Sequence, residues 1–218
     1  MKILAVEFSS QERSVAVVQG GRGSTPLLLG RAAETSGLRS LGLVEEALQC
    51  ARCQREEIQA IAVGLGPGSY TGIRGAIALA QGWQLGRGVG LMGLGSVECL
   101  AAQAAEEKMF GPVNLIIDAQ RAEFYLARYE ISPGAWRERE GLRLASFSEI
   151  ESLARRGERL LGPGASQWFA SAQNLFPDAA VLGSLACARP DFTPGEKLEP
   201  IYLRETAFKK APPPRTVS

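Results

Sequence analysis

Residues 64–74 have the sequence GLGPGSYTGIR, which joins two elements of different periodicity. A strand-forming run over residues 60–65 breaks at Gly66-Pro67-Gly68, and apolar residues at helical spacing follow over residues 70–85. Ser69 stands where the N-cap of that helix belongs. The stretch therefore predicts a strand and a helix joined by a glycine-rich turn.

Two interpretations of this turn remain open. The free backbone N–H groups at the start of a helix can receive a phosphate or a carboxylate. Alternatively, the glycines only allow the helix to lie close to the sheet. The spacing is neither that of a Walker loop, because no Lys-Ser/Thr pair follows, nor that of GxGxxG, because Ser69 holds the place of the last glycine.

The chain around this turn predicts three short strands in an antiparallel meander, then alternating helices and strands. Strand–helix–strand units need right-handed crossovers and therefore parallel pairing. We expect an α/β fold whose first lobe is a five-stranded mixed sheet flanked by helices. The expected strands are residues 2–8, 14–18, 26–32, 60–65 and 89–92, and the expected helices are residues 41–51, 70–85 and 96–109.

The second half partly repeats this plan in reduced form. It predicts strands at residues 113–117, 123–129, 142–145 and 159–161 and helices from residue 147 and over residues 165–174. Ser148 and Glu151 fit a capping box at the start of the first of these helices. We therefore expect an N-terminal lobe (1–108), a reduced C-terminal lobe (109–208) and a Pro-rich, polar and flexible tail (209–218).

Composition excludes several kinds of chemistry. The 218 residues contain no histidine, which excludes Ser-His-Asp and Cys-His catalysis and HExxH zinc sites. Lys plus Arg is 24 and Asp plus Glu is 23, so the net charge of +1 predicts weak binding of nucleic acid by this chain alone. With no membrane span, no signal peptide and only four cysteines, we expect a cytoplasmic location and reduced thiols.

Four residues are candidates for binding a cofactor. Glu7 and Asp118 end predicted strands in separate halves, where two carboxylates can face each other across a cleft and hold a divalent metal with a nucleotide. Gly162 and Gly164 flank a second strand–helix junction that could meet an adenosine or a phosphate. The competing interpretation is two surface carboxylates and a plain turn.

The GLGPGSYTGIR segment resembles the bacterial TsaB (YeaZ) family. The segments ILAVEFSS, AQGWQLG, DAQRAEFY and EPIYLRE, which begin at residues 3, 80, 118 and 199, extend the resemblance over most of the chain. The resemblance implies the two-lobed actin/Hsp70/sugar-kinase-like fold, with ribonuclease-H-like sheets. It also implies a non-catalytic subunit that works with TsaD and the ATPase TsaE to form threonylcarbamoyladenosine beside the anticodon of tRNA.

The chain departs from active relatives at the phosphate motifs. Glu7 stands where an aspartate is usual, and residues 9–12 and 118–121 lack the glycines that let a backbone approach a phosphate. The histidines with which TsaD-like relatives bind metal are absent. We therefore expect no catalytic residue, metal or cofactor in this chain, with ATP and a metal on the partner subunits.

The resemblance also implies a helical interface on the first lobe, to TsaD or to a second copy in a homodimer, with tRNA reached only through the complex. Leu41, Val44 and Leu48 would anchor it unless they belong wholly to the core. Gly72, Ala76 and Ala80 make the second helix slim on one side. Around the turn, the expected interface includes Gly66, Gly68, Ser69, Tyr70, Thr71 and Arg74.

Two other functions stay open at this stage. One is an enzyme of the same fold, either a nucleotide-dependent phosphotransferase or a glycoprotease-like peptidase. The other is a homodimeric binding module unrelated to tRNA.

Overall fold

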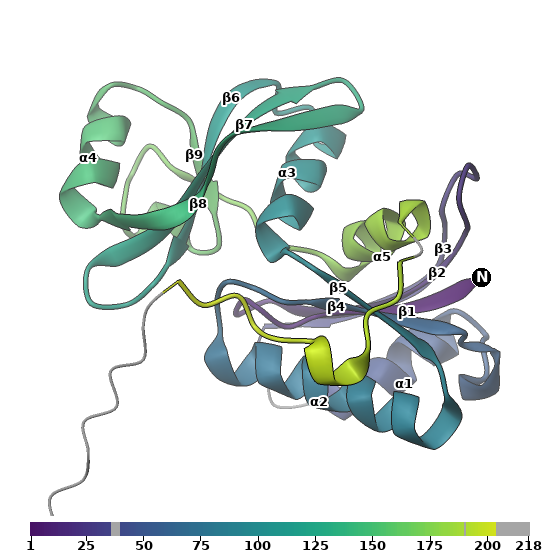
Figure 1. Cartoon of the computed structure of the whole chain (residues 1–218). Helices are drawn as coiled ribbons and strands as arrows, with labels where there is room; N and C mark the ends of the chain where they lie inside the picture. The colour runs from purple at the N-terminus through teal and green to yellow at the C-terminus, as the bar shows by residue number, and fades with distance from the viewer. Residues whose placement is uncertain (36–39, 190, 204–218) are drawn as a thin grey trace, which may run out of the picture.

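The computed structural model describes residues 1–35, 40–189 and 191–203. The expected flexible tail, residues 209–218, lies outside these residues, as does the side chain of Leu41. The described part forms two lobes, each built on one five-stranded sheet (Figure 1).

The first sheet has the order β3-β2-β1-β4-β5. β1 pairs antiparallel with β2 and parallel with β4, so that Val6 lies opposite Val15 on one side and Val63 on the other. The predicted mixed sheet is confirmed. Its strands are β1 (Lys2–Glu7), β2 (Arg13–Gln19), β3 (Leu27–Glu34), β4 (Ala60–Gly64) and β5 (Gly90–Leu94).

Helices cover both faces of this sheet. Figure 1 shows α1 (Ser40–Cys50) and α2 (Tyr70–Arg87) below it and α5 (Ala179–Ala188) above it. β1 is buried from Ile3 to Glu7 because neither face meets solvent, which explains its continuous apolar sequence. A short 3-10 helix, η1 (Arg55–Glu57), precedes β4.

The second sheet repeats the same plan, with the order β10-β9-β6-β7-β8. α4 (Phe147–Arg155) packs on one face of it, and α3 (Ser96–Glu106) lies between the two sheets with apolar residues in both lobes' cores. The predicted α/β class with two lobes of mixed sheets is therefore confirmed. The strands are β6 (Gly111–Asp118), β7 (Glu123–Ser132), β8 (Ala135–Ser146), β9 (Leu160–Gly162) and β10 (Gln173–Asn174).

Three local predictions in this half are wrong. The N-cap of α4 is Ser146, whose hydroxyl accepts from the Glu149 N–H at 3.3 Å, so the cap lies two residues before the predicted Ser148. β8 is longer than predicted because its charged residues face solvent at a sheet edge, where strands commonly carry charge. Residues 165–174 form a 3-10 turn, η2 (Ala165–Gln167), and the short β10 in place of a helix.

The chain returns to the first lobe after residue 178. The apolar residues of α5 pack with Ala5 and Val18 on the first sheet, and Leu198 enters the core below it. Residues 191–203, with the 3-10 helix η3 (Gly195–Lys197), run alongside β5 and α2. The expected C-terminal lobe of residues 109–208 therefore includes segments that belong spatially to the first lobe.

Candidate functional site

A cleft of about 430 Å³ lies between the lobes, and most of the predicted binding segments line it. Its walls are the turn after β1 (residues 9–11), the start of α2 (residues 68–70), the turn after β6 (residues 118–120) and the turn after β9 (residues 163–164). Strand ends from both lobes thus meet as the sequence predicted. Glu7 is not among the residues that line this cleft.

The Glu7 carboxylate points into the protein. Its side chain is fully buried, Oε1 accepts from the Ser9 N–H at 2.8 Å, and Oε2 accepts from the Ser96 hydroxyl at 2.8 Å. The Ser96 hydroxyl in turn accepts from the Gly66 N–H at 3.1 Å. Burial raises the pKa of Glu7, although its hydrogen bonds oppose this. The predicted arrangement, with Glu7 facing Asp118 across the cleft, is wrong because Glu7 links β1 to α3 inside the first lobe.

Asp118 lines the cleft but is already hydrogen-bonded locally. Oδ1 accepts from the Gln120 N–H at 2.7 Å and Oδ2 from its side-chain amide at 3.1 Å. Among the described residues that line the cleft there is no lysine or arginine, and three aromatic rings and several amide side chains surround Asp118. The lining is therefore polar and aromatic, without a cation to neutralise phosphate charge.

The glycines of the 64–74 stretch have a structural role. A Cβ at Gly64 would lie 2.0 Å from Glu7 Oε2, and a Cβ at Gly68 or Gly72 would lie 2.0 Å from the carbonyl oxygen of Ser9 or Phe8. The predicted N-cap is confirmed, since the Ser69 hydroxyl accepts from the Gly72 N–H at 3.3 Å. These contacts support the second interpretation of the turn, in which the glycines bring α2 close to β1.

The predicted Gly162 has a similar explanation. A Cβ there would lie 1.8 Å from the Ile116 carbonyl oxygen, so glycine is needed where β9 approaches β6. Gly164 lines the cleft and has a φ of +65°, which a glycine adopts without strain.

Several residues expected at a partner interface face the core instead. Val44 and Leu48 are buried against the first sheet, so they cannot anchor an external partner. Gly72, Ala76 and Ala80 form the face of α2 that is turned toward the same sheet, and Gly66 is also buried. Gly68 and Ser69 are half-buried, whereas the predicted Tyr70, Thr71 and Arg74 are exposed.

The exposed face of α2 carries a set of small residues that, apart from the predicted Thr71, were not among the expected interface residues. A Cβ added at Gly75, Gly82 or Gly86 would meet nothing within 4 Å, and the adjacent Leu85 side chain is 91% exposed. Their helical spacing places them on one side of the helix. We call this set the outer stripe of α2; it consists of Thr71, Gly75, Ala78, Gly82 and Gly86.

An aromatic stack borders the outer stripe. Arg74 lies over the Tyr70 ring at 4.4 Å from its centroid, and Tyr202, near the end of the described chain, stacks on Tyr70 at 5.6 Å. The C-terminal segment thus reaches the N-terminal end of α2, which adjoins both the cleft and the outer stripe. The periodicity of the sequence could not predict this contact, because Tyr202 is far from Tyr70 along the chain.

None of the helices within the described ranges combines the length and the apolar character that a membrane crossing requires.

Comparisons with known proteins agree with this geometry. The family model described as "TsaD: tRNA N6-adenosine threonylcarbamoyltransferase" matches residues 12–182. The tRNA threonylcarbamoyladenosine biosynthesis protein TsaB of Escherichia coli is 29% identical, over 97% of this chain and 99% of the relative. TsaB of Haemophilus influenzae is 25% identical, over 97% and 98%.

The solved structure of YeaZ from Pseudomonas aeruginosa superposes with a TM-score of 0.74 at 25% identity, and covers 93% of this chain and 99% of that one. The match to the family model covers well over half of the chain, and the full-length relatives and the shared two-lobed fold agree with one another. The chain therefore belongs to the TsaB (YeaZ) family, a relative of TsaD.

Proposed function

We propose that this chain is a non-catalytic accessory subunit that pairs with a TsaD-like catalytic subunit and a TsaE-like ATPase. Its family membership supports a role in the biosynthesis of threonylcarbamoyladenosine in tRNA. The proposed pairing goes further and rests on the surface of the first lobe.

The outer stripe of α2 is the observation that carries the proposal. A glycine inside a helix costs about 1 kcal/mol relative to alanine. Gly72 offsets this cost by letting α2 approach the Phe8 carbonyl, but Gly75 and Gly82 have no neighbour that a side chain would displace. Small residues on one helix face allow another helix to approach closely, and the exposed Leu85 supplies an apolar anchor beside them.

The cleft supports the non-catalytic part of the proposal. Its residues do not fit an ATP–metal pair, because Glu7 is buried, both Asp118 oxygens are hydrogen-bonded and the described lining contains no cation. A nucleotide-dependent phosphotransferase would need these groups for the phosphates. Titration of ATP with Mg²⁺ by calorimetry tests this point, and micromolar affinity would overturn it.

The experiment for the pairing compares two glycine variants. The purified chain and TsaD from its own organism are mixed, and the complex is measured by gel filtration and by calorimetry. We expect Gly82→Leu to weaken the complex at least tenfold, because the new side chain separates the two surfaces. The matched control is Gly21→Leu, at a half-buried loop glycine that also has nothing within 4 Å and no positive φ.

The two variants separate the interface from general effects. Both should keep the far-ultraviolet circular dichroism of the parent chain. Failure of the parent chain to bind TsaD at micromolar concentrations would contradict the pairing, and so would equal binding by the Gly82→Leu variant.

A further inference from the structure

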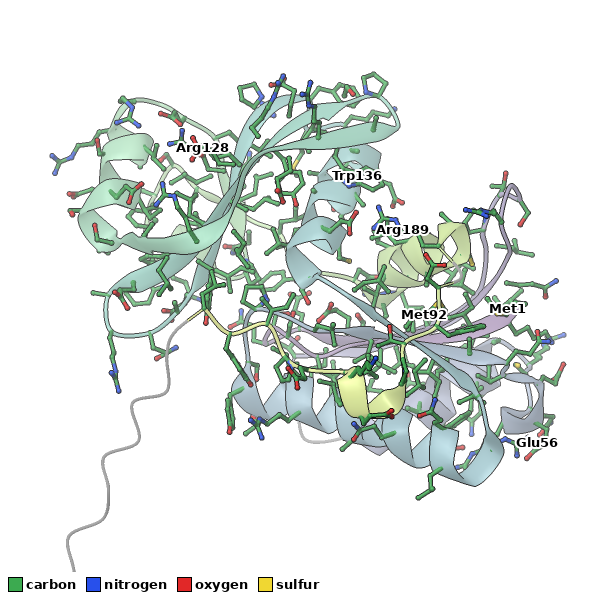
Figure 2. All side chains as sticks on the ribbon, viewed as in Figure 1. Met1, Glu56, Met92, Arg128, Trp136 and Arg189 are labelled. Atoms are coloured by element: carbon green, nitrogen blue, oxygen red, sulfur yellow. The ribbon has the colours of Figure 1, made fainter. Side chains whose placement is uncertain are left out.

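A second hollow, of about 670 Å³, lies between the lobes and is separate from the cleft described above. Its second-lobe wall comes from β7 and β8, and its first-lobe wall comes from the start of α3, the end of α5 and the C-terminal segment. Trp136 from the second lobe and Arg189 from the first, both labelled in Figure 2, line this hollow. We call it the front groove; the lining residues that matter here are Glu98, Tyr129, Trp136, Glu138, Arg189 and Ile201.

The front groove combines one partly exposed aromatic ring, that of Trp136, with surplus negative charge. Arg189 donates to both oxygens of Glu98, at 2.9 and 2.6 Å, so these two charges neutralise each other. The Tyr129 hydroxyl donates a hydrogen bond to the Glu138 carboxylate at 3.1 Å, and no salt bridge joins Glu138 to a cation among the described residues. A groove with the Trp136 ring and one carboxylate that has no salt bridge suits a basic segment that also has apolar, rigid residues.

This chain contains such a segment next to the groove. Ile201 lines the groove, and the described chain ends at Leu203. The sequence continues as RETAFKKAPPPRTVS, with four basic residues and one acidic residue. Six residues of fully extended chain span about 20 Å, and a turn needs only four residues to reverse direction. The length therefore allows residues 209–215 to return along the groove.

We propose that residues 209–215, KKAPPPR, bind the front groove of the same chain. The three prolines pack on the partly exposed ring of Trp136, as Pro-rich segments do in aromatic grooves, and the lysines face Glu138. Because the groove has walls from both lobes, a segment bound there holds the lobes in one relative orientation. The inference does not depend on the proposed pairing through α2.

Carbodiimide coupling on the full chain tests this proposal, since the reagent joins a lysine amine to a neighbouring carboxylate as an amide. The monomer fraction is isolated by gel filtration, digested and analysed by mass spectrometry. We expect a link between Lys209 or Lys210 and Glu138. The Lys2–Glu57 ion pair, with 2.5 Å between Nζ and Oε1, gives an internal reference link.

Three variants make the result specific. Trp136→Ala should reduce the link to Glu138 at least tenfold relative to the Lys2–Glu57 link. Trp168→Ala, at a half-exposed ring in the other cleft, should leave it unchanged. Replacing Pro212, Pro213 and Pro214 together by serine should reduce it several-fold; these residues lie outside the described fold, so this variant remains informative if Trp136→Ala does not fold.

The proposal is overturned if the monomer shows the reference link but no link from Lys209 or Lys210 to the groove. It is also overturned if the link appears only in a dimer fraction, because the segment then binds a second copy. An equal link in the Trp136→Ala and proline variants would show that charge alone, without the groove, brings the groups together.

Discussion

Gly64→Ala is the sharpest test of how the glycine-rich stretch works. The new methyl carbon would lie 2.0 Å from Oε2 and 2.5 Å from Cδ of Glu7, so the carboxylate must move. It is fully buried and has two hydrogen bonds of 2.8 Å, from Ser9 and Ser96. A hydrogen bond to a charged group contributes about 1.5–3 kcal/mol, so losing both costs about 3–6 kcal/mol of the free energy of unfolding.

Urea unfolding followed by circular dichroism measures this cost. With a urea slope of about 3 kcal/mol/M, at the upper end of the range for small proteins, the midpoint should fall by about 1–2 M. The control is Gly75→Ala, which meets nothing within 4 Å and should raise the free energy of unfolding by about 0.5–1 kcal/mol.

A double variant isolates the contact with Glu7. An aspartate at position 7 is one methylene shorter and withdraws from the new methyl group, so the costs of Glu7→Asp and Gly64→Ala should sum to more than the cost of the double variant. Additive costs would refute the assignment of the clash to this carboxylate. A cost of Gly64→Ala below about 1 kcal/mol would refute the packing role of the glycine itself.

Three further predictions address the pH dependence of stability, the N-cap of α4 and the packing of α5. Burial raises the pKa of Glu7 above its ordinary 4.5, so the native chain binds more protons than the unfolded chain between pH 4.5 and the folded-state pKa, and its stability falls as pH rises through this range. In Glu7→Gln this decline should disappear from urea unfolding measured across that range. An unchanged pH profile in the variant would contradict the prediction. Ser146→Ala should lower the free energy of unfolding by about 1 kcal/mol through loss of the α4 cap, whereas Ser148→Ala should change the thermal midpoint little. Equal effects of the two variants would contradict the assignment of the cap to Ser146. Gly183→Val should cost about 1–3 kcal/mol, because a Cβ there lies 2.6 Å from Val18 Cγ2; a thermal midpoint equal to the parent's would show that α5 does not pack closely on the first sheet.

Much of the first lobe was predictable because its local signals agree with its packing. The buried run of β1, the glycine-rich turn and the Ser69 cap all point to the observed elements. The second lobe was harder to predict. α5 is apolar on every side because it is buried between the first sheet and α3, so it has no helical period, and its sequence signal was only Asp178 as an N-cap before the apolar run.

The candidate site was predictable only in part, for a related reason. Sequence position places residues 9–11, 118–120 and 163–164 at strand ends, and parallel topology brings those ends to one cleft. It does not say whether the Glu7 side chain turns toward the cleft or toward Ser96. That direction depends on the space that Gly64 leaves beside it, which is a property of the packed lobe.

The α/β class, the order of elements in the first lobe and the absence of histidine chemistry follow from local periodicity, turn residues and composition, all of which are read directly from the chain. The exposed side of α2, by contrast, follows from how that helix packs on the first sheet. Small residues occur on both sides of that helix, with Gly72, Ala76 and Ala80 on one and Gly75, Ala78 and Gly82 on the other. The sheet buries the face that also carries Ile73 and Ile77 and leaves the other to solvent, and the small residues alone do not distinguish the two faces.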